Sequence, residues 1–230
     1  MKEEADDRAP REVPSGERLF ARLWRLDPGV SFLNHGSFGA CPAAVLDRQA
    51  ELRAELESEP VDFLVRRLPE RLAGVRALLG PFLAAEPDDL ALVPNATTGV
   101  NAVLGSLDLK PGDELLATSH AYPGCRKALA HACARAGARL VVADVPFPLG
   151  GEEDVVGPVL AAVSPRTRLA LLDHVTSPTA LVFPIERLVA ALRERGVETL
   201  VDGAHAPGMV PVDLDRLGAA WYTGNAHKWL

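Results

Sequence analysis

The chain has 230 residues, of which 48% are hydrophobic and 24% are charged. This composition is that of a folded globular protein, and it excludes a disordered tail or a collagen-like fibre. The 31 acidic residues outnumber the 24 basic ones, and the formal net charge of −7 argues against a nucleic-acid-binding protein, which needs a basic face.

No apolar run approaches the ~20 residues that a membrane-spanning helix needs, so we expect no contact with a membrane. The N-terminal residues lack the apolar core of a signal peptide. The three cysteines, Cys41, Cys125 and Cys133, are too few and too scattered for a disulfide framework or a cysteine-rich zinc site. We therefore expect a cytoplasmic protein without a structural metal.

The first part of the chain predicts a mobile head followed by two helices. Residues 1–17 are rich in charge and contain Pro10, Pro14 and Gly16, which is typical of a loosely docked head. Apolar residues at three- and four-residue spacing predict a helix over 42–58 and a second over 61–79. Pro69 is expected to break or kink the second helix.

From residue 90 onwards, short apolar runs alternate with helical patterns. Strands are expected at 90–93, 114–118, 139–143, 168–172, 198–201 and 219–223, and helices at 97–107, 123–136, 155–163 and 185–195. Strands that are apolar throughout and separated by helices indicate a mostly parallel sheet with helices on both faces. Residues 18–230 are thus expected to contain an α/β domain.

Polar residues follow five of the predicted strands. Ligands of such sheets bind at the carboxyl ends of the strands, so these residues are candidates for one site. They are Thr97 and Thr98, then His120 to Tyr122, His174 to Thr179, Asp202 to His205, and Thr223 to Lys228.

The motif VDGAHAPG places Asp202 directly after a predicted strand. An aspartate at a strand end is often a simple turn or helix cap. In a functional role, Asp202 would be a buried carboxylate that faces a cationic ring nitrogen. His205 is either a core histidine or a donor to a ligand oxygen.

The motif WYTGNAHKWL surrounds one of only four lysines, Lys228, with aromatic and apolar residues. Burial lowers the pKa of a lysine and makes its amine nucleophilic, which suits Schiff-base chemistry. The alternative is a structural lysine whose ammonium group reaches solvent from an apolar edge.

The motif PNATTGVN offers hydroxyls and backbone N–H groups at the start of a predicted helix, with Thr97, Thr98 and Gly99 in the turn. Such a helix start can bind a phosphate, although an ordinary threonine cap would look the same. A phosphate site, an acid for a pyridinium and a Schiff-base lysine are together the requirements of pyridoxal 5'-phosphate (PLP).

The motifs FLNHGSFGACP (32–42), PNATTGVNAVL (94–104), SHAYPGCRKAL (119–129), LLDHVTSPTALVFPI (171–185), VDGAHAPG (201–208) and YTGNAHKWL (222–230) resemble the class V aminotransferase-like PLP enzymes. The resemblance is strongest to the isopenicillin N epimerase-like branch, which includes C–S lyases of the ergothioneine pathway, and weaker to the cysteine desulfurases. It covers residues 30–230. It implies the large domain of the aspartate aminotransferase fold, fold type I.

The resemblance also implies roles for individual residues. Lys228 would be the Schiff-base lysine, Asp202 would pair with the pyridinium nitrogen, and His205 would contact the 3-hydroxyl oxygen of the ring. The phosphate would lie among Thr97, Thr98, Asn225 and His227. His120, or alternatively Tyr122, would stack on the cofactor, Ser177 would lie near it, and Asn34, His35 and Gly36 would line the substrate entrance; His174 and Thr176 match less well.

The implied function is a PLP-dependent enzyme that acts at the α-carbon of an amino acid, as an epimerase, a C–S lyase or an aminotransferase. Relatives continue beyond the lysine into a smaller C-terminal domain and form homodimers, whereas this sequence ends two residues after Lys228. We therefore expect a fragment that lacks the small domain. The second hypothesis is a truncated, non-catalytic remnant that binds the cofactor weakly at most.

Overall fold

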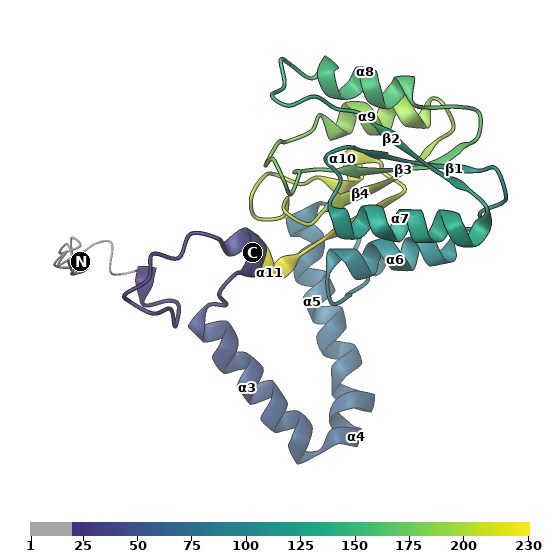
Figure 1. Cartoon of the computed structure of the whole chain (residues 1–230). Helices are drawn as coiled ribbons and strands as arrows, with labels where there is room; N and C mark the ends of the chain where they lie inside the picture. The colour runs from purple at the N-terminus through teal and green to yellow at the C-terminus, as the bar shows by residue number, and fades with distance from the viewer. Residues whose placement is uncertain (1–19) are drawn as a thin grey trace, which may run out of the picture. The chain divides into compact units, whose positions relative to one another are not determined.

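The computed structural model describes residues 20–230, and the charged head predicted for residues 1–17 lies outside these residues. The chain divides into two units, Met1–Val65 and Arg66–Leu230 (Figure 1). Among the described residues, no helix has the length and apolar character needed to span a bilayer.

Helices dominate the described part of the first unit. They are α2 (His35–Phe38), α3 (Ala43–Ser58) and α4 (Pro60–Asp62). Helix α3 confirms the helix predicted over 42–58, and it begins directly after Pro42. The Ala43 amide donates a hydrogen bond of 2.7 Å to the Leu23 carbonyl, which ties the start of α3 to the segment before it.

The helix predicted over 61–79 is interrupted near Pro69, as expected, but the interruption does not end it. A π-helical turn, η1 (Phe63–Arg67), leads directly into α5 (Leu68–Leu83). Pro69 lies in the first turn of α5, where the missing N–H has no helical acceptor to lose. The α-helical hydrogen-bond pattern is therefore broken by the wider π turn before Pro69, and the helix then continues as α5.

The second unit is built on a sheet of five parallel strands in the order β2-β1-β3-β4-β5. The strands are β1 (Glu114–Thr118), β2 (Arg139–Ala143), β3 (Thr167–Asp173), β4 (Glu198–Gly203) and β5 (Trp221–Gly224). Every residue of β1 is buried, and so is nearly all of β3 and β4. The structure thereby confirms the predicted parallel α/β sheet.

Helices cover both faces of this sheet (Figure 1). One face packs on α6 (Ala96–Ser106) and α7 (Pro123–Ala136), through Leu115, Leu171 and Leu200 of the sheet. The other face packs on α8 (Glu153–Ala161) and α9 (Ile185–Arg193), through Leu116, Leu172 and Val201. Three short helices complete the unit: η2 (Pro87–Asp89), α10 (Leu214–Leu217) and α11 (Ala226–Trp229).

The strand predicted over Leu90–Val93 is wrong. Leu90 has extended backbone angles, φ −93° and ψ 123°, but the segment pairs with no strand among the described residues. A cavity of about 1190 Å³ is lined by this segment and by β5, together with the end of α5. Apolar sequence alone produces an extended chain, whereas a strand also needs a neighbour within hydrogen-bonding distance.

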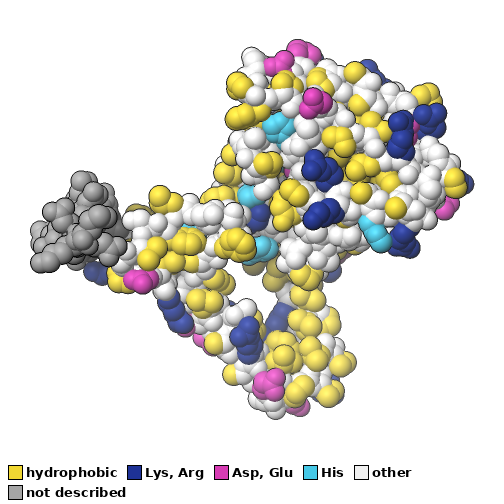
Figure 2. All heavy atoms as spheres, viewed as in Figure 1, with side chains coloured by type: hydrophobic (Ala, Val, Ile, Leu, Met, Phe, Trp, Pro, Cys, Tyr) yellow, Lys and Arg dark blue, Asp and Glu magenta, His cyan; other side chains and the backbone are white. Residues whose placement is uncertain are grey.

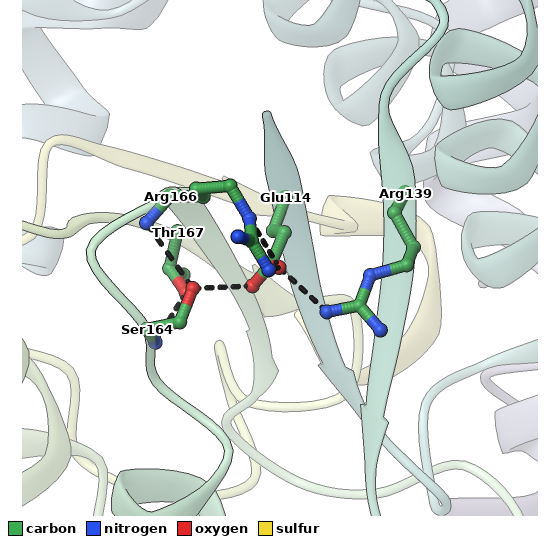
Figure 3. A network of polar contacts seen from close by, with 5 residues as sticks. All are labelled: Glu114, Arg139, Ser164, Arg166 and Thr167. Atoms are coloured by element: carbon green, nitrogen blue, oxygen red, sulfur yellow. Dashed lines mark hydrogen bonds and ion pairs between the residues drawn. The ribbon is translucent and has the colours of Figure 1, made fainter. Parts of the chain in front are cut away.

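The amino ends of the strands are joined by a buried carboxylate, Glu114, which is 1% exposed (Figure 3). Its Oε1 accepts hydrogen bonds from Arg139 at 2.6 Å and from Arg166 at 2.9 Å, and its Oε2 accepts one from Ser164 at 2.7 Å. The Ser164 hydrogen bond, followed by those of the two arginines, lowers the pKa of Glu114 to about 2. Glu114 therefore connects β1 to β2 and to the turn before β3.

Replacement of Glu114 by glutamine should destabilise the fold, because the charge-assisted hydrogen bonds of the arginines are lost. The expected cost is about 2 kcal/mol in the free energy of unfolding near neutral pH. The folded-state pKa of Glu114 lies below its ordinary value of 4.5, so this contribution is present above pH 4.5 and disappears as the pH falls towards 2. Urea denaturation at several pH values measures it.

Glu198→Gln is the matched control, since Glu198 also begins a strand but is exposed. A loss of stability in Glu114→Gln that is no larger than in this control, or that persists unchanged at pH 2, would contradict the assignment.

Candidate active site

Two buried acids end the central strands of the sheet. Asp173 is the last residue of β3 and is 2% exposed, and Asp202 in β4 is 3% exposed. The two are direct partners in the register of β3 and β4. Alternation along each strand puts both side chains on the face that packs on α6 and α7, because Leu171 and Leu200 also lie on that face.

Asp202 has neutral hydrogen-bond donors and no cationic partner. Its Oδ1 accepts a hydrogen bond from the Ala204 amide at 3.0 Å, and its Oδ2 accepts one from the Cys125 thiol at 3.2 Å. Within the described part of the chain, no basic side chain forms an ion pair with Asp202. A buried carboxylate without a cation is a site that a protonated ring nitrogen fits.

Lys228 lies in α11, which follows β5, and its amine contacts His205. The distance from Lys228 Nζ to His205 Nε2 is 3.0 Å, and the Trp229 indole N–H donates to His205 Nδ1 at 3.4 Å. An indole N–H can only donate, so Nδ1 is the acceptor and Nε2 carries the proton of the neutral ring. The Nε2–H can donate to Lys228 only if the amine is unprotonated.

Burial favours these neutral forms. It lowers the pKa of Lys228, an effect that the charge of Asp202 partly opposes. Burial also lowers the pKa of His205, and the positive charge of a protonated Lys228 would lower it further. Lys228, His205 and Asp202 thus interact electrostatically within one site.

The start of α6 is held by two asparagine side chains. Asn95 Oδ1 accepts the Thr98 amide at 2.9 Å as an N-cap, and Asn225 Oδ1 accepts the Ala96 amide at 2.8 Å. Among the described residues, the Thr97 amide has no bonded acceptor in this first turn. A free N–H at the positive end of a helix is suited to bind an anion such as a phosphate.

The first turn of α6 also packs directly against the segment that leads to Lys228. The Thr223 hydroxyl donates to the Ala96 carbonyl at 3.2 Å. A Cβ on Gly99 would overlap Thr223 Oγ1 and lie 3.1 Å from its Cβ. The first turn of α6 is therefore in direct contact with the strand that precedes Lys228.

His120 and Tyr122 lie in different environments after β1. His120 is 7% exposed, and both ring nitrogens are bonded: Nε2 to the Val145 carbonyl at 3.0 Å and Nδ1 to the Thr179 hydroxyl at 2.8 Å. Thr179 also bonds to the Thr176 hydroxyl at 2.8 Å. Tyr122 is 42% exposed, and its amide donates to Asp173 Oδ1 at 3.4 Å.

The remaining predicted site residues are more dispersed. Ser177 and His227 are exposed, and His174 bonds to the Tyr222 hydroxyl at 3.0 Å. Asn34, His35 and Gly36 lie at the start of α2 in the first unit, where the His35 ring packs edge-on against Phe32. The second unit by itself brings together Asp202, His205, Lys228, Asn225 and the start of α6.

Sequence reasoning missed Asp173, Cys125 and Asn95 as parts of this site. Asp173 gave the same signal as Asp202, an acid at the end of an apolar strand, and could have been found in that way. Cys125 and Asn95 act through contacts with distant or capping groups, and their sequence surroundings do not distinguish them from packing and turn residues.

The sequence model of the family described as Aminotransferase class-V matches residues 40–230. Isopenicillin N epimerase from Streptomyces clavuligerus is 38% identical over 205 residues, which cover 89% of this chain and 52% of the relative. L-cysteine desulfhydrase from Arabidopsis thaliana is 34% identical over 216 residues, which cover 87% of this chain and 48% of the relative. The chain spans about half the length of the curated relatives that it matches.

Solved structures of C-DES have the same fold. The complex between the cystine C–S lyase C-DES and its reaction product cysteine persulfide superposes with a TM-score of 0.80 at 29% identity, over 88% of this chain and 55% of that one. A C-DES mutant with glycine covalently linked to its PLP cofactor gives a TM-score of 0.79 at 28% identity, with the same coverage.

Replacement of Gly99 by alanine should separate the first turn of α6 from Thr223. The added methyl group overlaps a short, buried side chain, and the expected cost is about 1–3 kcal/mol in the free energy of unfolding. Chemical denaturation measures this loss. Gly105→Ala in the same helix meets open space, and it should be neutral or stabilising. Equal effects of the two substitutions would contradict the close packing described above.

Proposed function

Because the chain belongs to the aminotransferase class-V family, we propose that it binds PLP at the carboxyl edge of its sheet and acts at the α-carbon of an amino acid. The observation that carries this proposal is the buried carboxylate of Asp202, which lacks a cation and lies in one electrostatic cluster with Lys228. The proposed activity is that of a whole enzyme, and the chain spans about half the length of its curated relative.

Each group of the site suits one part of PLP. Asp202 would hold a proton on the ring nitrogen, and the His205 N–H would bind the oxygen on the ring. The Thr97 amide, at the start of α6, would bind the phosphate, and the Thr98 hydroxyl would join it by exchanging its hydrogen bond to Asn95 Oδ1, 3.1 Å, for one to the phosphate. Lys228 would supply the amine that holds the cofactor covalently, because burial favours its nucleophilic neutral form.

When bound, PLP supplies a ring that withdraws electrons from the α-carbon of the amino acid. The unprotonated Lys228 amine can then take the α-proton, and the charge of Asp202 keeps the ring nitrogen protonated. Epimerases, C–S lyases and aminotransferases share this proton transfer. The described residues therefore support the reaction class, and the fate of the proton and of the β-substituent would decide between its members.

We infer that Tyr122, rather than His120, stacks on the cofactor. Both nitrogens of His120 are bonded within the protein, and its ring lies edge-on to Phe183, with centroids 6.0 Å apart. Tyr122 is exposed, and its amide contacts Asp173 on the sheet face that carries Asp202. The exposed ring of Tyr122 is accessible to a ligand, whereas the ring of His120 is buried by its own neighbours.

A homodimer is the proposed assembly of the whole protein. Helix α5 exposes large apolar side chains, among them Leu78 at 79% and Phe82 at 50%, and Figure 2 shows hydrophobic side chains gathered along this helix. A second copy of the chain could bury them.

The three free cysteines, two of them buried, support a reducing, cytoplasmic location.

Borohydride reduction of the PLP-loaded protein should attach the cofactor to Lys228 and to no other lysine. The other lysines of the second unit, Lys110 and Lys127, are exposed and lie outside the cluster of Asp202, His205 and Lys228. Peptide mass spectrometry after reduction locates the label. A label on Lys110 or Lys127 at comparable yield would remove Lys228 from its proposed role.

Tyr122→Ala should weaken PLP binding by about fivefold or more, because a stacked aromatic pair contributes about 1 kcal/mol beyond its buried area. Tyr122→Phe is the control and should bind PLP as tightly as the unchanged protein. Cofactor titration followed by absorbance measures both dissociation constants. Unchanged binding in Tyr122→Ala would return His120 as the candidate.

Leu78→Glu should weaken self-association of the PLP-loaded protein, because it places a charge in the exposed apolar face of α5. Sedimentation velocity over a range of concentrations measures the change. Lys127→Glu, an exposed charge reversal on α7, serves as the comparison. If the unchanged protein is a monomer at all concentrations, or if Leu78→Glu and Lys127→Glu dimerise equally, a dimer formed through α5 is contradicted.

A further inference from the structure

Asp173 is a buried acid that the proposed chemistry does not use. Its Oδ1 receives a long hydrogen bond from the Tyr122 amide, 3.4 Å, and its Oδ2 has no hydrogen-bond partner although it is buried. No basic side chain forms an ion pair with it among the described residues. An ionised carboxylate in such a position is costly, because a buried charge needs donors or a counter-ion.

Asp202 is the neighbour that makes this cost larger. The two acids are partners in the register of β3 and β4 and face the same side of the sheet. Adjacent buried carboxylates rarely both ionise, so one of them is expected to keep a proton. Burial first, and then the charge of Asp202, raises the pKa of Asp173 to about 8.

The hydrogen bonds decide which acid is ionised. Asp202 accepts hydrogen bonds from the Ala204 amide at 3.0 Å and from the Cys125 thiol at 3.2 Å. Asp173 has one weak donor in the Tyr122 amide. Its other charged or titratable neighbour is Cys125 on α7, whose thiol pKa is raised by burial, so that the thiol stays neutral. Charge is therefore stabilised on Asp202 and not on Asp173.

We propose that Asp173 is a positioning residue that keeps its proton on Oδ2 and thereby leaves the single negative charge of the pair on Asp202. The inference rests on the proposed function in one respect, that the charged Asp202 faces the ring nitrogen of PLP. A neutral Asp173 allows Asp202 to stay ionised inside the protein, and it supplies an O–H that can donate to a group entering the site.

The test compares the melting temperature of the unchanged protein with that of Asp173→Asn, both without cofactor, at several pH values. The amide of asparagine has the shape of a protonated acid and can donate a hydrogen bond, but it cannot ionise. The unfolded chain loses the proton of Asp173 near its ordinary pKa of 3.8, whereas the folded protein keeps it until about pH 8. The melting temperature of the unchanged protein should therefore fall relative to that of Asp173→Asn as the pH rises from 4 to about 8. Above this pH, the difference should stay constant.

Asp202→Asn supplies the second arm, since it removes the neighbouring charge. In that background, the pH at which the same difference stops widening should fall by about one unit or more. Asp144→Asn, at an exposed aspartate directly after β2, is the control and should show no such pH dependence. A difference between Asp173→Asn and the unchanged protein that is the same at every pH would show a purely structural residue and overturn the proposal.

PLP binding to Asp202→Asn separates this inference from the proposed function. If the pH experiment succeeds while Asp202→Asn binds PLP as tightly as the unchanged protein, the role of Asp202 at the ring is wrong and the protonation of Asp173 stands. If PLP binding falls at least tenfold and the melting difference does not depend on pH, the role of Asp202 stands and the proposal for Asp173 is wrong.

Discussion

Parallel alignment of the strands is the constraint on which the site depends. It places the carboxyl ends of β3, β4 and β5 side by side, so that the charge of Asp202 influences Lys228 although the chain makes a crossover between them. The helix that would bind the phosphate is tied to the same edge by Asn225 and Thr223, residues that precede Lys228 by only a few positions. One short segment therefore contains the lysine and is hydrogen-bonded to the first turn of α6.

Buried acids at the amino ends of the strands and at the carboxyl ends have opposite environments. At the amino edge, Glu114 is surrounded by two arginines and a serine, and its charge is fully satisfied. At the carboxyl edge, Asp173 and Asp202 have neutral donors or none. The first arrangement stabilises the fold. The second leaves a buried negative charge without a cationic partner, which a cationic ligand can supply. Such an arrangement is typical of functional sites.

Much of the fold could be predicted from the sequence because local signals agreed with the tertiary environment. The apolar runs at 114–118 and 139–143 are strands, and the helix patterns at 123–136 and 185–195 are helices. Asp202 and Lys228 could be found because a polar residue in an apolar stretch is conspicuous. The unpaired segment 90–93, the partner of Cys125 and the two bonds of His120 could not be found, since each depends on residues distant in sequence.

The hydrogen bonds around His120 have one direction, and this has a mechanical consequence. The Val145 carbonyl can only accept, so Nε2 carries a proton, and in the neutral ring Nδ1 then accepts from Thr179. The Leu181 amide can only donate, to Thr176. With both ends determined, the hydroxyls between them cannot reverse singly, and each bond polarises the next. Hydrogen bonds through Thr176 and Thr179 to His120 thus connect the loop that contains Ser177 to the loop that contains Tyr122. These two loops are thus connected before any ligand binds, and a ligand that bound beside them would lose little free energy in ordering them.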